Sequence, residues 1–146
     1  MDAQLNTEPK NKKIKLDFKD SKYATGRRKK SIAKVWLKKG SGNIYVNGKK
    51  ITDYFKKQNL QIAIYRPLAV VNRKNEFDAR CSVKGGGLSG QAGAIIHGLS
   101  RAIVLFEPDL KTALKKEKLT TRDSRSVERK KYGRRKARRS YQFSKR

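Results

Sequence analysis

Regularly spaced apolar side chains occur only in the middle of this 146-residue chain, between residues 23 and 119. Residues 1–22 are polar with scattered apolar side chains, and from residue 120 onward apolar side chains are sparse and follow no period. A segment without an apolar face cannot bury enough surface to offset the entropy lost on ordering. The sequence therefore predicts one globular domain over residues 23–119, a flexible arm over residues 1–22 and an extended basic tail over residues 120–146.

Positive charge limits what this chain can bind. The sequence holds 39 Lys and Arg against 12 Asp and Glu, a formal net charge of +27, and residues 120–146 alone hold 12 basic and two acidic side chains. Like charges at this density repel each other unless a polyanion neutralises them, which points to nucleic acid or an anionic membrane surface. The longest apolar run, residues 102–106, is far shorter than the roughly 20 residues that a bilayer crossing needs. Nucleic acid is therefore the favoured partner, with no membrane.

Cysteine content and the first residues bear on the compartment. The single cysteine, Cys81, excludes an internal disulfide framework and is typical of a reducing compartment. Residues 1–22 contain four acidic side chains, no Arg and no apolar stretch, so they indicate neither a transit peptide nor a secretory signal. These features favour a cytoplasmic protein.

A period of two predicts strands in the domain. Ala33, Val35 and Leu37 share one face of a run, and a glycine-containing loop over residues 39–43 leads to the apolar residues 44–46. Two such runs joined by a short loop predict a hairpin in which they pair as neighbours.

Further elements follow along the domain. Thr52 is expected to cap a short helix ending at Phe55, and residues 59–65 continue helically until Pro67 interrupts them. Residues 68–71 fit a strand or a helix, with a strand preferred.

The clearest strand and helix come next. Residues 77–84 alternate, with one apolar face formed by Phe77, Ala79, Cys81 and Val83. Residues 92–106 keep the i, i+3, i+4 spacing of an amphipathic helix that Pro108 ends, and residues 109–118 predict another short helix. Together these elements predict a two-layer α+β domain with helices on one face of a small sheet.

Glycines between that strand and helix match a dinucleotide motif, since Gly85, Gly87 and Gly90 have G-x-G-x-x-G spacing. A dinucleotide site also requires an acidic residue at the end of the next parallel strand, whereas here the helix leads into more helix-like sequence. The glycines, with Gly86, therefore predict a tight turn. Bare N–H groups at a helix N-terminus can also approach a phosphate, so contact with RNA is compatible with that turn.

His97 is the only histidine, and it lies off the apolar stripe on the same helical side as Arg101. Nothing marks a nucleophile and an orienting acid beside it, so His97 is predicted to be an ordinary surface residue or, with Arg101, to face RNA. Cys81 is predicted to fill the core, and no Cys/His cluster has the spacing of metal ligands. The sequence predicts no cofactor, no metal and no enzyme.

Runs of basic residues are the main binding candidates. Guanidinium groups pair with phosphates, and aromatic rings interleaved among the tail cations can stack on bases. RNA is favoured over DNA because an extended cationic strand can thread crevices of folded RNA, and no helix resembles a basic recognition helix. Besides the four glycines, the predicted RNA-binding residues are Arg27, Arg28, Lys29, Lys30, Arg101, Arg122, Arg125, Arg129, Lys130, Lys131, Tyr132, Arg134, Arg135, Lys136, Arg138 and Arg139.

Three segments, taken in order, resemble the bacterial-type small ribosomal subunit protein nine family. They read YATGRRKKSIAKVWLKKGSGNIYVNGK, FDARCSVKGGGLSGQAGAIIHGLSRAIV and LTTRDSRSVERKKYGRRKARRSYQFSKR, and with their spacer they cover residues 23–146. The most specific parts are GGGLSGQAGA and the terminal SKR. Residues 1–22 exceed the shortest family members and have no assigned role.

The resemblance implies a structural component of the head of the small ribosomal subunit. Its α+β domain would contain a small mixed sheet with a left-handed βαβ crossover, and the domain and tail would bind ribosomal RNA beside neighbouring ribosomal proteins. The family's tail runs toward tRNA in the peptidyl site, where Lys145 and Arg146, preceded by Phe143 and Ser144, would approach phosphates of the anticodon stem-loop. The predicted location is the ribosome, cytoplasmic or organellar.

The sequence leaves two alternatives to ribosomal RNA binding. A DNA-compacting architectural protein would also be small and cationic, and it would bind random duplex DNA as well as ribosomal RNA. An enzyme that binds a nucleotide at the glycine turn would lose that binding when Gly87 is replaced.

Overall fold

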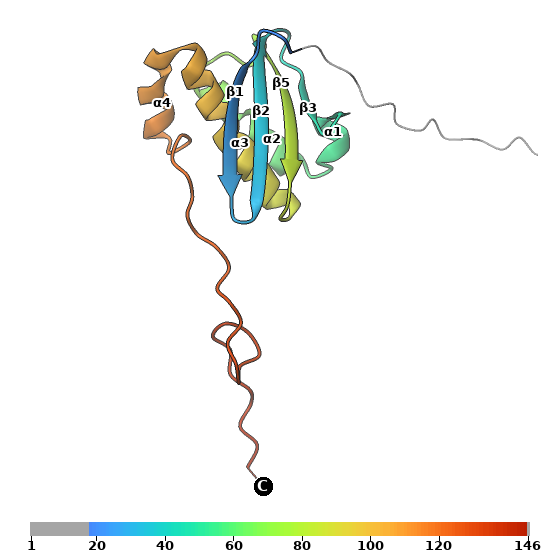
Figure 1. Cartoon of the computed structure of the whole chain (residues 1–146), viewed down its shortest axis with the longest axis vertical. Helices are drawn as coiled ribbons and strands as arrows, with labels where there is room; N and C mark the ends of the chain where they lie inside the picture. Colours follow the sequence, from blue (N-terminus) through green and yellow to red (C-terminus); the bar gives the residue numbers. More distant parts are fainter. Residues whose placement is uncertain (1–17, 146) are drawn as a thin grey trace, which may run out of the picture.

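The computed structural model describes residues 18–145, so most of the predicted arm and the terminal Arg146 lie outside the described residues. The described elements form a mixed sheet and a set of helices (Figure 1). In chain order they are β1 (Lys22–Arg28), β2 (Ser31–Lys39), β3 (Ile44–Val46), β4 (Lys49–Lys50), α1 (Ile51–Tyr54), α2 (Gln58–Val70), β5 (Phe77–Lys84), α3 (Leu88–Phe106), the 3-10 helix η1 (Pro108–Leu110) and α4 (Lys111–Lys116).

The five strands of the described chain have the order β1-β2-β5-β3-β4. β5 pairs antiparallel with β2 on one side and parallel with β3 on the other. The predicted hairpin between residues 33–37 and 44–46 is therefore wrong, because β5 lies between the two strands. The intervening loop crosses the start of β5 instead, where the Gly40 N–H donates to the Glu76 carbonyl (2.8 Å) and the Asn43 N–H donates to the Asp78 carboxylate (2.8 Å).

The parallel neighbours β3 and β5 are joined through α1 and α2, which makes a βαβ connection. Its left-handedness stays an implication of the family resemblance. A true hairpin joins β1 to β2 across Lys29 and Lys30, with Arg28 opposite Ser31. Lys29 takes a positive φ of 51° to make this turn.

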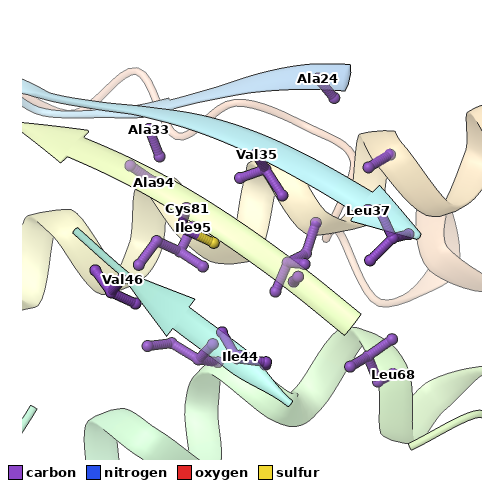
Figure 2. Close-up of a cluster of buried hydrophobic side chains, with 14 of the residues drawn as sticks. Ala24, Ala33, Val35, Leu37, Ile44, Val46, Leu68, Cys81, Ala94 and Ile95 are labelled. Carbon is purple, nitrogen blue, oxygen red and sulfur yellow. The ribbon is translucent and has the colours of Figure 1, made fainter. Parts of the chain in front are cut away.

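The core lies between the sheet and the two long helices. α2 and α3 lie on one side of the sheet in Figure 1, and Figure 2 shows side chains of β2 and β3 directed toward the helical layer. Val35, Leu37 and Val46 are fully buried there with Ile95 of α3 and Leu68 of α2. The alternate residues of the strands face the opposite, open side. The two-layer α+β prediction is confirmed, with a mixed sheet.

Two local predictions in the α1–α2 region are wrong. Helix α1 begins at Ile51 with Lys50 at its N-cap, so Thr52 lies inside the helix and caps nothing. Helix α2 passes through Pro67 and reaches Val70, so residues 68–71 form no strand. Pro67 lacks an N–H for the helix, but Pro67 and Leu68 are fully buried. Burial of their apolar surface outweighs the missing hydrogen bond.

The later predictions are confirmed. β5 spans residues 77–84 with the expected buried face. Helix α3 contains the predicted residues 92–106 but begins earlier, at Leu88, and it ends before Pro108. The short helix predicted for residues 109–118 is present as η1 followed by α4.

A close approach of backbone to backbone holds α3 against β1. A Cβ on Gly26 would lie 1.9 Å from the Ala94 carbonyl oxygen and 2.4 Å from the Gly98 nitrogen. Only glycine leaves room for this contact. The glycine that precedes the basic run therefore sets the distance between the sheet and the helix.

Residues 120–145 contain no helix and no strand, and Arg134 and Ser140 form an isolated bridge. Because the extended form of this basic segment is not established by these features, it stays a prediction. Within residues 18–145, no helix has the length and apolar character to cross a membrane.

Candidate nucleic-acid interface

The fold brings the β1–β2 turn and the glycine turn together at one end of the sheet. β2 and β5 pair antiparallel with Ile32 opposite Lys84, so the turn that begins β2 lies beside the turn that ends β5. A Cβ on Gly85 would lie 2.5 Å from the Lys30 carbonyl oxygen. The cations at residues 27–30 and the glycines at residues 85–90, all predicted to bind RNA, therefore lie on one continuous surface.

Ser31 fixes the glycine turn. Its hydroxyl donates to the Gly85 carbonyl (3.0 Å), and the Gln91 side-chain amide donates to the same oxygen (3.2 Å). Gly85 and Gly86 have φ values of 73° and 64°, which favour glycine. A Cβ on Gly86 would lie 2.1 Å from the Ser31 hydroxyl. The interpretation of residues 85–87 as a tight turn is confirmed, whereas Gly90 lies buried in the first turn of helix α3.

Gly87 differs from the other glycines of the turn. It is the exposed N-cap of α3, and a Cβ placed on it would meet no atom within 4 Å. Open backbone at the N-terminus of a long helix favours an anion. Phosphate contact at this turn stays a prediction.

The order of elements is not that of a dinucleotide fold. β5 has its parallel neighbour, β3, earlier in the chain, and helix α3 is followed by η1 and α4. The described chain thus has no parallel strand after α3 that could present an acidic residue to a ribose. The glycine spacing is explained by the turn.

His97 is not an ordinary surface residue. It is half-buried, its Nδ1 accepts the Arg27 N–H (3.2 Å), and a second hydrogen bond joins it to the backbone of Thr120. Burial lowers the pKa of His97, and the nearby Arg101 lowers it further. The neutral ring thus connects β1 to the start of the C-terminal segment, and this role replaces the surface prediction.

Two of the predicted RNA-binding arginines, Arg101 and Arg28, also make contacts within the protein. Arg101 donates to the Thr25 carbonyl (2.7 Å). The Arg28 side chain lies across Gly93, and its guanidinium is 3.6 Å from the Asp123 carboxylate. Asp123 also accepts two hydrogen bonds from the Arg125 guanidinium (3.0 and 2.9 Å), which hold its pKa well below the usual range.

Asp123 was missed at the sequence level because an isolated acid in a basic segment has no motif. With buried Leu119 and the Thr120–His97 contact, it fixes where the C-terminal segment leaves the domain. The direction of the first tail cations is therefore set by the domain.

Beyond that point the predicted residues are exposed. Arg138 makes two hydrogen bonds to Glu128 (2.9 and 2.7 Å), which lower the pKa of that carboxyl. The Arg135 guanidinium lies 5.6 Å from the Tyr141 ring centre. Exposed cations and rings are available to a partner over the rest of the segment, at Arg122, Arg129, Lys130, Lys131, Tyr132, Arg134, Lys136, Arg139, Phe143, Ser144 and Lys145.

Cys81 is fully buried, and burial raises the pKa of its thiol to about 12, so the inward placement predicted for it is confirmed. Over residues 18–145, no group of three or more His, Cys, Asp or Glu side chains is arranged to hold a metal ion.

The sequence model of the family described as ribosomal protein S9/S16 matches residues 26–146. The matched range includes the β1–β2 turn, the glycine turn and the whole basic segment.

Proposed function

Because the chain belongs to the ribosomal protein S9/S16 family, we propose that it docks its domain on ribosomal RNA at the paired turns and extends its basic segment to tRNA in the peptidyl site. Membership makes the chain a structural component of the small ribosomal subunit that binds ribosomal RNA, beside neighbouring ribosomal proteins. Our proposal adds three points to family membership: the location in the head of the subunit, the surfaces that contact ribosomal RNA, and the contact with tRNA.

The observation that carries the proposal is the charge of the C-terminal segment. Residues 120–146 have 12 basic and two acidic side chains. Both acids, Asp123 and Glu128, are already paired with arginines of the same segment. The remaining cations need an external polyanion, because the segment has no buried face to order it.

Docking of the domain would use the surface formed by residues 27–30 and 85–90. Arginine and lysine there offer charge-assisted bonds to phosphates, and Gly87 offers an open helix N-terminus. Such contacts position a protein on RNA without reading its sequence. The segment starting at Asp123 would then continue over the RNA as an extended chain.

Contact with tRNA is assigned to the last residues, Ser144, Lys145 and Arg146. A peptidyl site must accept every tRNA, so phosphate contacts that ignore base identity suit it. Ordering the segment costs roughly 1–2 kcal/mol per residue in backbone entropy, and its dozen cations offset that cost through contacts along the RNA.

The test is removal of Lys145 and Arg146 from the full chain. Small subunits assembled with this variant should form normally and should lose tRNA from the peptidyl site about tenfold faster, since one or two phosphate contacts are lost. Dissociation of labelled tRNA from purified subunits measures this rate.

A matched control replaces two exposed lysines between α1 and α2, Lys56 and Lys57, with alanine. The same charge is lost far from the tail, so tRNA dissociation should not change. Equal dissociation from the truncated and intact subunits would mean that the tail does not hold tRNA.

A further inference from the structure

The open face of the sheet carries a cross-strand row of aromatic and cationic side chains. By register, Tyr23 of β1 lies opposite Trp36 of β2, Trp36 opposite Arg80 of β5, and Arg80 opposite Tyr45 of β3. The Tyr23 and Trp36 ring centres are 5.3 Å apart, and the Arg80 guanidinium lies 5.6 Å from the Trp36 ring centre. Lys50 of β4 continues the row opposite Tyr45.

Tyr23 stands at the exposed end of this row. β1 is the edge strand of the sheet formed by residues 18–145, and Tyr23 is 45% exposed. Trp36 and Tyr45 are only partly buried although they occupy central strands. Aromatic rings that keep part of their surface accessible to solvent side by side on a sheet face are typical of a binding surface.

Charged side chains on the same face are almost all positive. The face is recognised by the strand residues that alternate with the buried ones. On β1, β2 and β5 it carries a single acid, Asp78, which already accepts the Ser41 and Asn43 N–H groups (3.0 and 2.8 Å). Its cations on these strands are Arg27, Lys34, Lys38, Arg80 and Lys84.

We infer that this face binds an unpaired stretch of RNA, with a base stacked on the Tyr23–Trp36 pair and phosphates beside Lys34 and Lys38. The inference rests on the proposed ribosomal RNA binding and adds a site at Tyr23, Lys34, Trp36 and Lys38, none of which belongs to the paired turns or the C-terminal segment. Its occupant follows from charge complementarity and from the rings.

Unpaired RNA fits better than a duplex. Bases in a duplex are stacked on each other and present only edges and phosphates, whereas unpaired bases can stack on aromatic side chains. Lys34 and Lys38 stand two residues on either side of Trp36, about 7 Å along the strand. Phosphates that flank a stacked base therefore meet a cation on each side.

Trp36 is the only tryptophan, so its fluorescence reports this face in the full chain even while the C-terminal segment also binds RNA. A single-stranded 12-nucleotide RNA and a duplex of the same sequence are titrated at physiological salt, and total binding is measured in parallel by gel shift. The single strand should quench Trp36 saturably, and the duplex should bind with much less quenching.

Paired variants isolate stacking from charge. Tyr23→Ala should weaken the quenching transition about tenfold, whereas Tyr23→Phe, which keeps the ring, should not. Lys34→Ala should lower the slope of log RNA affinity against log salt by about one unit. Lys111→Ala on α4 should leave the quenching of Trp36 unchanged. Thermal unfolding of each variant checks that the domain is intact.

The outcomes separate this site from the proposed function. Gel-shift binding with no change in Trp36 emission, or equal quenching by duplex, overturns the inference but leaves ribosomal RNA binding in place. Failure of the wild-type chain to bind ribosomal RNA at all overturns both. A photoreactive side chain at position 23 should crosslink to RNA in assembled subunits, and crosslinking to a protein alone assigns the face to a protein partner instead.

Discussion

The sheet with its helices, over residues 22–119, and the segment over residues 120–145 are held by different forces. In the domain, apolar side chains from both layers are fully buried, and even the basic run at residues 27–30 is placed by strand pairing. Past Leu119 no described side chain is buried. Contacts there include the exposed Arg138–Glu128 ion pair, the partly exposed Arg28–Asp123 contact back to β1, and backbone hydrogen bonds such as that from the Arg135 N–H to the Arg139 carbonyl (2.9 Å).

The two regions therefore differ in whether they keep their structure without a binding partner. Burial of apolar surface is not screened by salt and requires no partner, so the domain can present its turns before any RNA binds. Exposed ion pairs contribute little and are screened by salt. The segment can therefore give up its internal pairs when phosphates become available, and its path depends on the RNA.

The largest expected effect tests the domain. Gly26→Ala places a Cβ 1.9 Å from the Ala94 carbonyl oxygen and 2.4 Å from the Gly98 nitrogen, and neither backbone atom can give way locally. Helix α3 must then move off β1, and we expect the free energy of unfolding to fall by about 3 kcal/mol or more. Chemical denaturation followed by circular dichroism measures the change.

The matched change in the segment is Gly133→Ala. A Cβ there meets no atom within 4 Å. Unfolding of the domain should be unaffected, because nothing buried depends on that residue. A similar loss of stability in both variants would contradict the separation of the two regions.

The fold was predictable from the sequence where an element's pattern is local. Residues 77–84 and 92–106 carry their own periods of two and 3.6, and both elements are present as expected. Strand order was not predictable, since β3 pairs with β5 across more than 30 residues of chain. Pro67 was misjudged because its burial in the core, which keeps α2 helical, depends on other elements.

The candidate site divides in the same way. Composition alone indicated that the cations of the turn and the tail bind RNA, because runs of basic residues are visible in the sequence without knowledge of the fold. His97 was wrongly predicted to lie on the surface, because both of its hydrogen-bond partners, Arg27 and Thr120, are far from it in the sequence. The aromatic row at Tyr23 and Trp36 depends on strand register, which periodicity does not give.

The next effect concerns RNA affinity. Replacing Arg134, Arg135 and Lys136 with alanine removes three exposed cations of the segment. The slope of log affinity for ribosomal RNA against log salt should fall by about 2 to 3, because each lost phosphate contact removes about one unit. The thermal midpoint of the domain should stay the same.

Its control removes three lysines from the domain instead, at Lys111, Lys115 and Lys116 of α4. Net charge falls equally, so any effect of overall charge appears in both variants. If the α4 variant loses as much salt dependence as the segment variant, the binding follows net charge and the segment has no special part.

A smaller effect comes from the connection between the regions at His97. Burial, Arg101 and Arg122 hold the pKa of His97 below its usual 6.5, so the unfolded chain takes up the proton first as the pH falls. Stability is therefore complete above pH 6.5 and declines below it, toward the lower pKa of the folded state. A protonated Nδ1 also cannot accept the Arg27 N–H. Thermal unfolding between pH 8 and pH 5.5 measures this decline, which His97→Gln should flatten.

The smallest effect is at the Glu128–Arg138 pair. Glu128 accepts two hydrogen bonds from the Arg138 guanidinium (2.9 and 2.7 Å) and so competes with phosphate for that side chain. Glu128→Gln leaves the shape of residue 128 and removes its charge, and we expect RNA to bind about twofold more tightly at low salt, with the gain lost at high salt. Glu128→Gln combined with Arg138→Ala should show no gain, because the released guanidinium is absent. Tighter binding in both variants would assign the effect to the general charge of the segment, and weaker binding of the single variant would mean that the pair itself shapes the segment for RNA.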